Sequence, residues 1–447
     1  MESLTLAIAA VGVAVVAVGR PVYGLIAYLS ILLLYPDYLR VSLGTVDISA
    51  CRIVVCALVV RCLAEPQLTS RFQWKLLDKL VFVSALVNAA TLAMTTPFEP
   101  WLENRFGFVM DTLVVYVAVR LVVVDRQAFE TILKALGVLV VAMAAHAVFE
   151  MFTGKSLYMG LGQYCPWAPN KGMEFQTRFG LNRAMGPSGE TIMFGLTFAC
   201  LAPLLWILRH TPGWRGRGFL FAAAACVGVA ATVSSGPYMA LLVVAGCLAL
   251  ERMKSLVRPA IVIAIVGCLA IELGSNRHFY YVLGDFTMDP ESAWYRARLI
   301  DVAISKIPEY WKYGYGFGDP GWGPLIDGRS RSDGVNDYVV QAVLHGIFGL
   351  AVYLGVLAAA LHGVVRKYRE TRSQWTRSAV WALACAMIGM MTAFWSVSLF
   401  GQTISVFYVL LGMHGALAAA TRTVTAARPA WVPTTNSYAA RSVSAPA

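Results

Sequence analysis

Apolar runs recur along almost the whole chain, and they constrain its fold more than any other feature. Repeated runs of about 17 to 22 residues fit the thickness of a lipid bilayer rather than the core of a soluble domain. The chain is 58% hydrophobic and 14% charged, whereas soluble domains carry roughly 25% charged residues. We therefore expect an all-α, polytopic integral membrane protein.

The runs predict roughly 12 to 13 transmembrane helices. Lys and Arg gather in alternate short loops, as at Arg209, Arg215 and Arg217, and this bias assigns those loops to the cytoplasm. The long polar stretches 154–187 and 274–335 are then two extracytoplasmic loops. The predicted helices cover 4–19, 22–35, 48–60, 80–94, 106–124, 131–152, 190–208, 219–233, 238–250, 260–273, 338–365, 379–397 and 403–420.

This pattern divides the chain into three parts. Residues 1–153 are N-terminal transmembrane helices, and 154–425 form a membrane region that includes both long loops and carries any chemistry. Residues 426–447 are rich in Pro, Ser, Thr and Ala, which predicts a disordered cytoplasmic tail.

Charge and cysteine usage exclude several classes of function. The formal net charge is +11, but many of the basic residues sit in short loops, where they act as orientation signals rather than as a nucleic-acid surface. The nine cysteines are scattered without a Cys-x-x-Cys pair, so neither a zinc site nor a disulfide framework is expected. We expect no nucleic acid, no metal and no cofactor.

Arginines stand out in both long loops. The first loop carries Arg178 and Arg183, and Ser188 is expected to cap the helix that follows, an arrangement suited to an anion. The second loop carries Arg296 and Arg298, which face the same way in an extended segment and diverge in a helix. Two readings stay open: contact with lipid headgroups or solvent, and a clamp on a diphosphate.

A glycine-rich segment from Gly314 to Gly318 lacks the spacing and the preceding strand of a dinucleotide loop. It predicts a tight turn beside the membrane. The aromatic residues around it, such as Trp311 and Trp322, fit an interfacial belt or a surface that stacks on sugars.

Ionisable residues also lie inside or beside predicted spans. Asp337 stands at the start of the 338–365 run, and His345 lies about 12 Å deeper at 1.5 Å per residue. Asp337 is expected either to cap its helix or to act in chemistry. His345 is expected to bond a neighbouring helix or to take part in a site, and Glu150 with His146 forms a second polar pair.

Several short motifs follow one another in a fixed order: Arg183-Ala-Met-Gly186, Thr232-Val-Ser234-Ser235-Gly236, Arg296, Gly314-Tyr-Gly316-Phe-Gly318, Asn336-Asp-Tyr338 and Gly346-Ile-Phe-Gly349. Taken together, they resemble the signature of the O-antigen ligase and O-antigen polymerase superfamily, GT-C-type membrane glycosyltransferases of bacterial surface polysaccharide synthesis. The resemblance covers roughly 180–415 in motifs and the whole chain in topology.

The chain departs from the family pattern at two positions. Val335 replaces the loop His, and Ser235 replaces an Arg. If the family's His acts on the acceptor hydroxyl, this chain must use another group, and Asp337 is better placed than Asp333 or His345. The alternative is that the usual activity is lost.

The resemblance implies transfer of an oligosaccharide from a polyprenyl-diphosphate donor to a glycan acceptor, on the periplasmic face of the bacterial inner membrane. The lipid bilayer and polysaccharide export machinery are the other expected partners. The expected catalytic residues are Asp337, Arg296, Asn336 and His345, and the expected substrate-binding residues are Arg183, Arg298, Arg178 and Tyr338.

Three other readings stay open at this point. Within the family, the sequence does not separate a polymerase from a ligase, although the missing His favours a divergent exopolysaccharide polymerase. Outside it, the chain is a transporter or flippase of polysaccharide or lipid-linked glycan, or a non-catalytic member of the assembly machinery. Convergence of Arg183 and Arg296 would favour the enzyme.

Overall fold

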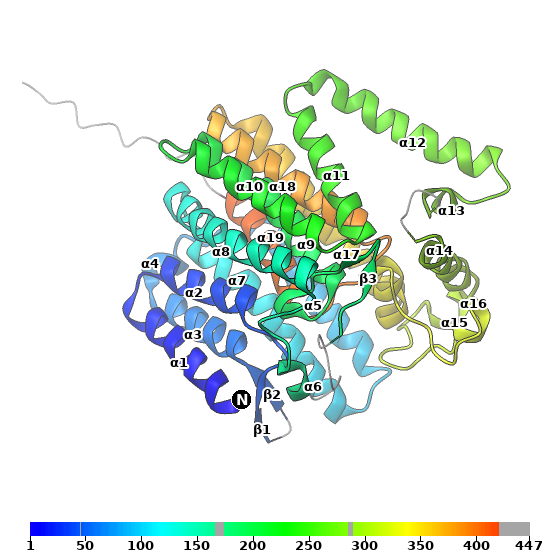
Figure 1. Ribbon diagram of the computed structural model, residues 1–447, viewed down its shortest axis with the longest axis horizontal. Coiled ribbons are helices and arrows are strands. Elements are labelled where there is room, and N and C mark those ends of the chain that lie inside the picture. The colour runs from blue at the N-terminus through cyan, green and yellow to red at the C-terminus, as the bar shows by residue number, and fades with distance from the viewer. Residues whose placement is uncertain (45, 166–173, 285–288, 420–447) are drawn as a thin grey trace, which may run out of the picture.

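The computed structural model describes residues 1–44, 46–165, 174–284 and 289–419. Helices form nearly all of the regular structure in these ranges, as Figure 1 shows. The strands form two small antiparallel hairpins, β1 (Arg40–Leu43) with β2 (Val46–Ser49) and β3 (Thr177–Arg178) with β4 (Leu181–Asn182). The predicted all-α class is confirmed. The predicted tail, 426–447, lies outside the described residues.

Seven helices of the described chain are long and apolar enough to cross a membrane, so the chain is a multi-pass membrane protein. They are α5 (Leu76–Ala93), α8 (Arg126–Thr153), α9 (Thr191–Trp206, extended by η4, Ile207–His210), α12 (Val257–Gly274), α17 (Asp337–Glu370), α18 (Gln374–Ala393) and α19 (Gln402–Ala419).

Shorter helices lie at the other predicted runs. A total of 12 to 13 crossings stays a prediction, because these helices are too short to establish a crossing by length. They are α1 (Glu2–Val18), α2 (Pro21–Leu34), α3 (Ala50–Ala64), α10 (Arg215–Ala231), α11 (Ser235–Leu250), and the continuous series α6 (Phe98–Val109), η1 (Met110–Val114) and α7 (Val115–Val122). Single turns complete the connections: α4 (Pro66–Thr69), η2 (Leu161–Tyr164), η3 (Gly186–Ser188) and η5 (Lys254–Leu256).

Helix α9 forms the centre of the bundle and packs against α8, α10, α11 and α18. It is apolar on all sides, and a helix of that kind is stable only where other helices surround it. Gly195 lets α11 approach closely, since an added Cβ would lie 2.6 Å from Pro237 and 2.7 Å from the Thr232 hydroxyl. This contact brings the α10–α11 turn to the end of the bundle where α9 begins.

Basic side chains join helix ends at the opposite end of the bundle. Arg120 in α7 binds Asp78 in α5 at 2.7 Å, and Arg209 in η4 binds Glu251, just after α11, at 2.7 Å. Both pairs connect ends that alternating helices would place on one membrane face. The packing therefore agrees with the predicted alternation, while the compartment on that face stays a prediction.

Helix α12 differs from every helix around it, because it stands apart from the bundle (Figure 1). None of its hydrophobic window is buried against the protein. An apolar surface on all sides is suited to contact with lipid. The long helix thus reaches from the basic end of the bundle to the polar stretch 274–335.

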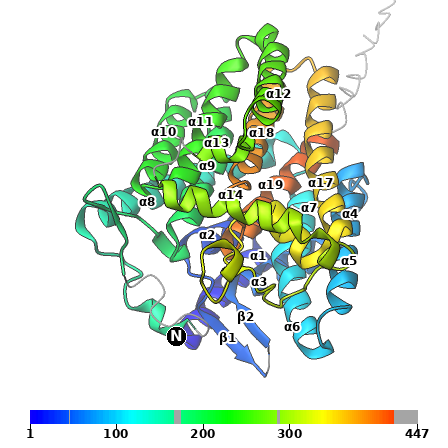
Figure 2. The ribbon, with the colours of Figure 1, turned by 90° about the vertical axis from the view of Figure 1, so that its right-hand side faces the viewer.

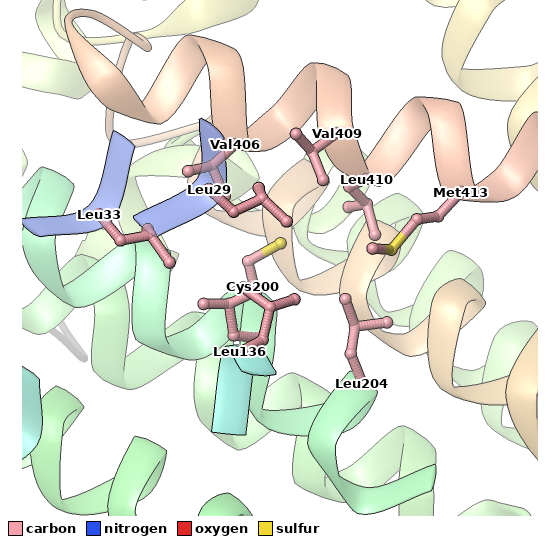
Figure 3. Close-up of a pocket in the computed structure, with 10 residues that line it drawn as sticks. Leu29, Leu33, Leu136, Cys200, Leu204, Val406, Val409, Leu410 and Met413 are labelled. Atoms are coloured by element: carbon pink, nitrogen blue, oxygen red, sulfur yellow. The ribbon is translucent and has the colours of Figure 1, made fainter. Parts of the chain in front are cut away.

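A small apolar pocket lies within the bundle, between α2, α8, α9 and α19 (Figure 3). Its volume is about 10 Å³, room for roughly one water molecule, and its lining is almost wholly aliphatic. Leu29, Leu136, Cys200 and Met413 are among the side chains around it. A space of this size and polarity is a packing defect, and we assign it no ligand.

The described residues of the stretch 274–335 (274–284 and 289–335) fold into a layer of short helices, the loop layer, and Figure 2 shows α14 crossing the face of the molecule there. Its described helices are α13 (Phe279–Gly284), α14 (Pro290–Ser305), α15 (Ile307–Tyr310) and α16 (Gly323–Ile326). Tyr310 and Trp322 are buried in its small core, with ring centroids 5.7 Å apart. Trp311 and Phe317 stay 44% and 46% exposed, so only part of the aromatic run is free for a belt or a sugar.

The two glycine motifs meet where the loop layer contacts α17. Gly346 interrupts α17 with φ 67° and ψ −166°, and the N–H of Ile347 donates to the carbonyl of Trp311 at 2.8 Å. A Cβ on Gly314 would lie 2.5 Å from the backbone of Leu344. Glycine is needed here for close approach of two backbone segments, which agrees with the structural role predicted for the Gly314 motif.

Candidate functional site

The β3–β4 hairpin presents two of the predicted arginines. Its two-residue turn, Phe179 and Gly180, has φ values of 54° and 76°, as a type I′ turn requires. Arg178 ends the first strand, and Arg183 follows the second. The Arg183 N–H donates to the carbonyl of Gln176 at 2.9 Å, which extends the hairpin by one more pair.

Arg183 is buried, with 8% of its surface exposed. Its Nη2 donates to the Ser234 hydroxyl at 2.6 Å, and its Nη1 donates to the side chain of Gln176. Its Nε is buried without a hydrogen-bond partner among the described residues. The guanidinium is thus held from two sides and keeps one donor unused.

The turn after Arg183 is fixed by Glu150 at the end of α8. The Glu150 Oε2 accepts the backbone N–H groups of Met185 and Gly186, both at 2.9 Å, and Oε1 lies 2.9 Å from His146 Nε2. The carboxylate is fully buried. The predicted polar pair therefore exists, and its carboxylate anchors the backbone that carries Arg183.

Arg178 reaches across to the α10–α11 turn and to the loop layer. Its Nη1 donates to the Val233 carbonyl at 3.4 Å, and its Nη2 donates to Asp289 Oδ2 at 3.2 Å. Val233 has φ 44°, which is strained for a β-branched residue. Strain of this kind concentrates at functional sites.

Arg296 comes from α14, whose first residue follows the N-cap Asp289. The Asp289 carboxylate accepts the backbone N–H of Ser292 at 3.2 Å and its hydroxyl at 2.8 Å. Arg296 lies on the following turns and is half-buried, and its Nε has no hydrogen-bond partner in the described part of the chain. One carboxylate thus starts α14 and also lies near two arginines.

Arg178, Arg183 and Arg296 therefore come together, and we call them the arginine cluster. Burial lowers the pKa of Arg183, and the charges of Arg178 and Arg296 lower it further. Burial likewise lowers the pKa of Arg296, with an additional effect of Arg178. Both shifts mean that the charged guanidinium groups are removed from water and repelled by the neighbouring arginines.

Two carboxylates offset these three cations. The pKa of Asp289 is lowered mainly by its hydrogen bonds from Ser292, with smaller effects of Arg178 and Arg296. The negative charge of Glu190 partly opposes the lowering of the Arg183 pKa. Within the described residues, three cations face two anions and buried Nε donors are unused. A bound anion would complete such a site, because charge-assisted bonds from guanidinium groups are strong.

Arg298 is not part of the cluster. It follows Arg296 by two residues in a helix, so it points about 200° around the α14 axis from Arg296. Its Nε donates to the carbonyl of Leu325 at 3.4 Å, and its Nη1 lies 4.0 Å from Asp301. Of the two alternatives for this segment, the helical one is confirmed.

The four residues predicted around the start of α17 form a second group, the α17 set: Asn336, Asp337, Tyr338 and His345. Asn336 is the N-cap of α17, since its Oδ1 accepts the N–H of Val339 at 3.0 Å, while its Nδ2 donates to the carbonyl of Trp395 at 3.0 Å. Asp337 was one candidate for the cap of this helix, and that alternative was wrong by one residue, because the Asn336 side-chain amide takes the capping position.

Asp337 is buried, with 3% of its surface exposed. Its Oδ2 accepts a hydrogen bond from the Tyr353 hydroxyl at 2.5 Å, and its Oδ1 accepts the Leu399 N–H at 3.0 Å. Both oxygens are therefore engaged within the protein. A carboxylate engaged in this way joins α17 to the segment before α19.

Tyr338 and His345 are also bonded to neighbouring helices. The Tyr338 hydroxyl donates to the carbonyl of Met391 in α18 at 2.9 Å, and His345 Nδ1 lies 3.1 Å from the Thr91 hydroxyl in α5. His345 thus makes the interhelical contact that was one of its two expected roles.

Sequence reasoning missed three contributors to the cluster. Asp289 precedes Pro290 at a helix start, a recognisable N-cap signal, but its contact with Arg178 is not local. Ser234 was noticed only within a motif, and Glu150 only as half of a pair. Ser188 was wrong as a helix cap, since α9 begins at Thr191 and the Ser188 hydroxyl bonds the carbonyls of Met185 and Glu190.

No group of three or more His, Cys, Asp or Glu side chains in the described residues could hold a metal ion. The site that the fold does assemble is one of guanidinium groups, which bind anions rather than metals.

No family model matches this chain, and no curated protein is significantly similar to it. The resemblance drawn from the motifs therefore rests on their order and placement alone.

Proposed function

We propose that the chain is a membrane glycosyltransferase of the O-antigen ligase or polymerase type, which transfers oligosaccharide from a polyprenyl-diphosphate donor in surface or exopolysaccharide synthesis. The observation that supports this is the arginine cluster. Guanidinium groups from two loops far apart in sequence converge beside a membrane-spanning bundle, and two of them keep buried donors without a partner among the residues that the structure describes.

The chemistry of the proposed transfer matches this arrangement. The acceptor hydroxyl oxygen forms a bond to the anomeric carbon of the donor while the bond from that carbon to the diphosphate oxygen breaks. The departing polyprenyl diphosphate gains negative charge, which preorganised cations stabilise more strongly in a partly buried site than in water. Arg178, Arg183 and Arg296 would supply these cations without a metal.

The hydroxyl proton needs an acceptor. Asp337, the residue favoured by the sequence, bonds Tyr353 and Leu399, which lie outside the arginine cluster. Asp289 and Glu190 are the carboxylates whose charges act on the cluster. We assign the proton to one of these two, since a general base must lie within reach of the reacting hydroxyl.

Transport is the competing function, and the break in α17 is the observation that favours it. Transporters bind substrate at interrupted helices that line a cavity. Here the N–H of Ile347, next to the break, donates to Trp311 of the loop layer. The break is filled by protein, which favours a packed structural joint over a transport path.

A reconstituted reaction would test the proposal. The purified protein is placed in liposomes with a polyprenyl-diphosphate-linked oligosaccharide, with and without a soluble glycan acceptor, and products are separated by mass. Longer lipid-linked chains indicate a polymerase, and transfer only to the added acceptor indicates a ligase. Release of no polyprenyl diphosphate under either condition, from protein that remains folded, would reject the enzyme and leave transport or assembly.

A further inference from the structure

A second polar site lies on the other face of α14. A cavity of about 470 Å³ opens between α13, the segment before it and α14, and Figure 2 shows the two helices next to each other. Trp294, Asp301 and Ala293 line it from α14. Trp294 and Arg296 are two residues apart, about 200° around the helix, so α14 separates this cavity from the arginine cluster. We call it the α14 pocket.

The polar groups of the α14 pocket are partly fixed in place. The Asp301 carboxylate accepts hydrogen bonds from the hydroxyls of Tyr280 and Tyr281, at 2.5 Å each. Burial and the hydrogen bond to Asp301 together raise the pKa of Tyr281 to about 12, so the hydroxyl keeps its proton and remains a donor. The carboxylate is thus oriented and still partly exposed.

The remaining lining is aromatic and cationic. Trp294 is 49% exposed although it lies in the middle of a helix, and an indole beside a polar cavity offers a flat apolar face. His278 lies 2.7 Å from Glu272. Arg277 has no ion pair among the described residues and adds positive charge to the wall. Asn276 adds an amide.

This combination selects one class of ligand. A sugar ring has apolar faces that pack on an indole and hydroxyl groups that bond carboxylate, amide and guanidinium groups. The volume falls within the range of about 300 to 1,000 Å³ that is usual for small-molecule sites. The wall is too polar for an acyl chain, and it carries one fixed carboxylate rather than a metal cage.

We propose that the α14 pocket binds the glycan portion of a substrate, a short oligosaccharide held against Trp294 and Asp301. Arg277 should favour chains with acidic sugars over neutral ones. Binding of oligosaccharide to the pocket does not depend on the proposed glycosyltransferase function. The further statement that this oligosaccharide is the acceptor or the growing chain rests on that function.

The test measures binding without any lipid donor, so its outcome is independent of turnover. Tetragalacturonate and cellotetraose are titrated into the full-length protein in nanodiscs, and affinity is measured by calorimetry. We expect both to bind, the acidic chain more tightly. Trp294→Ala should weaken binding about tenfold or more, because it removes the stacking face.

Trp311→Ala is the matched control, since Trp311 is 44% exposed in the same loop layer but lies outside the pocket lining. It should bind as the wild type does. Absence of binding by both tetrasaccharides to folded wild-type protein, or equal affinity for Trp294→Ala, would overturn the proposal. Loss of binding when anionic lipid replaces neutral lipid in the nanodiscs would also overturn it and identify a headgroup site. Failure of transfer with binding intact would reject only the proposed reaction.

Discussion

The arginine cluster and the α17 set are both polar groups that the sequence marked as a site, yet they differ in how their hydrogen-bonding capacity is used. In the cluster, the Nε atoms of Arg183 and Arg296 are buried without partners in the described residues. In the α17 set, each side chain bonds a group elsewhere in the bundle, as Asp337 does with Tyr353 and Leu399.

The difference separates binding from architecture. A buried polar group with satisfied partners holds helices together and has little left to offer a substrate. A buried cation with unused donors is unfavourable on its own, and a bound anion would relieve it. Both regions stand out in the sequence because they carry polar or charged side chains in an apolar chain. Only the hydrogen-bond partners of these side chains, which the structure shows, distinguish the two regions.

The largest effect is expected at Arg296. Arg296→Ala should lower transfer about 10²- to 10³-fold, the usual loss when a donor to the developing charge is removed, with the thermal midpoint unchanged or slightly raised. Activity in liposomes and thermal unfolding in detergent would be measured together. Arg329→Ala is the matched control, since Arg329 is an exposed arginine of the loop layer. Wild-type activity in Arg296→Ala would remove the cluster from the site.

Asp337 tests the other side of the comparison. Asp337→Ala leaves the Tyr353 hydroxyl and the Leu399 N–H buried and unpaired, at about 1 to 3 kcal/mol for each group. We expect the midpoint of unfolding to fall by several degrees while activity per folded molecule stays within a few-fold of wild type. Asp319→Ala, at an exposed loop position, should change neither. A 100-fold loss of activity with unchanged unfolding would restore Asp337 as the catalytic base.

The membrane architecture was largely predictable because apolar periodicity is local. Runs such as 131–152 and 403–420 coincide closely with α8 and α19. Hydropathy does not reveal neighbours, however. Windows of α9 and α12 have mean hydropathies of 2.1 and 2.0, yet 89% of one and none of the other is buried in the protein. Lipid and protein surround an apolar helix equally well, so sequence alone cannot choose between them.

The arginines of the candidate site could be predicted from the sequence, whereas the carboxylate and the hydroxyl that bond them could not. Arg178, Arg183 and Arg296 were conspicuous because charge is rare in such a chain. Asp289 and Ser234 act through contacts that span 111 and 51 residues, which no local pattern encodes. The small β3–β4 hairpin was missed for a related reason, since two-residue strands give no alternation to detect.

A smaller effect is expected where the cluster meets the α10–α11 turn. Ser234→Ala removes the acceptor of the 2.6 Å bond from Arg183, which frees the guanidinium and leaves a further buried donor. A hydrogen bond to a charged group contributes about 1.5 to 3 kcal/mol. A loss at the lower end of that range corresponds to a roughly tenfold fall in kcat/KM. Ser305→Ala, in α14 outside the cluster, serves as the control. An effect as large as that of Arg296→Ala would mean that Ser234 contacts the substrate itself.

The smallest effect concerns Asp289 and acid. Its pKa is lowered in the folded protein, mainly by the hydrogen bonds from Ser292, so its contribution to stability is present above the unfolded value of about 3.9 and is lost as pH falls through the folded value. Asn caps a helix about as well as Asp, so Asp289→Asn keeps the cap and removes the charge beside Arg178. At pH 7 we expect its thermal midpoint to lie about one or two degrees below wild type. The two midpoints should begin to converge below about pH 4, and the difference should be fully lost only below the lowered pKa of Asp289 in the folded protein. Unfolding scans of both proteins between pH 7 and pH 3 would show this. A difference that persists unchanged at pH 3 would mean that Asp289 acts through its shape rather than its charge, and the electrostatic balance of the cluster would then depend on Glu190 alone.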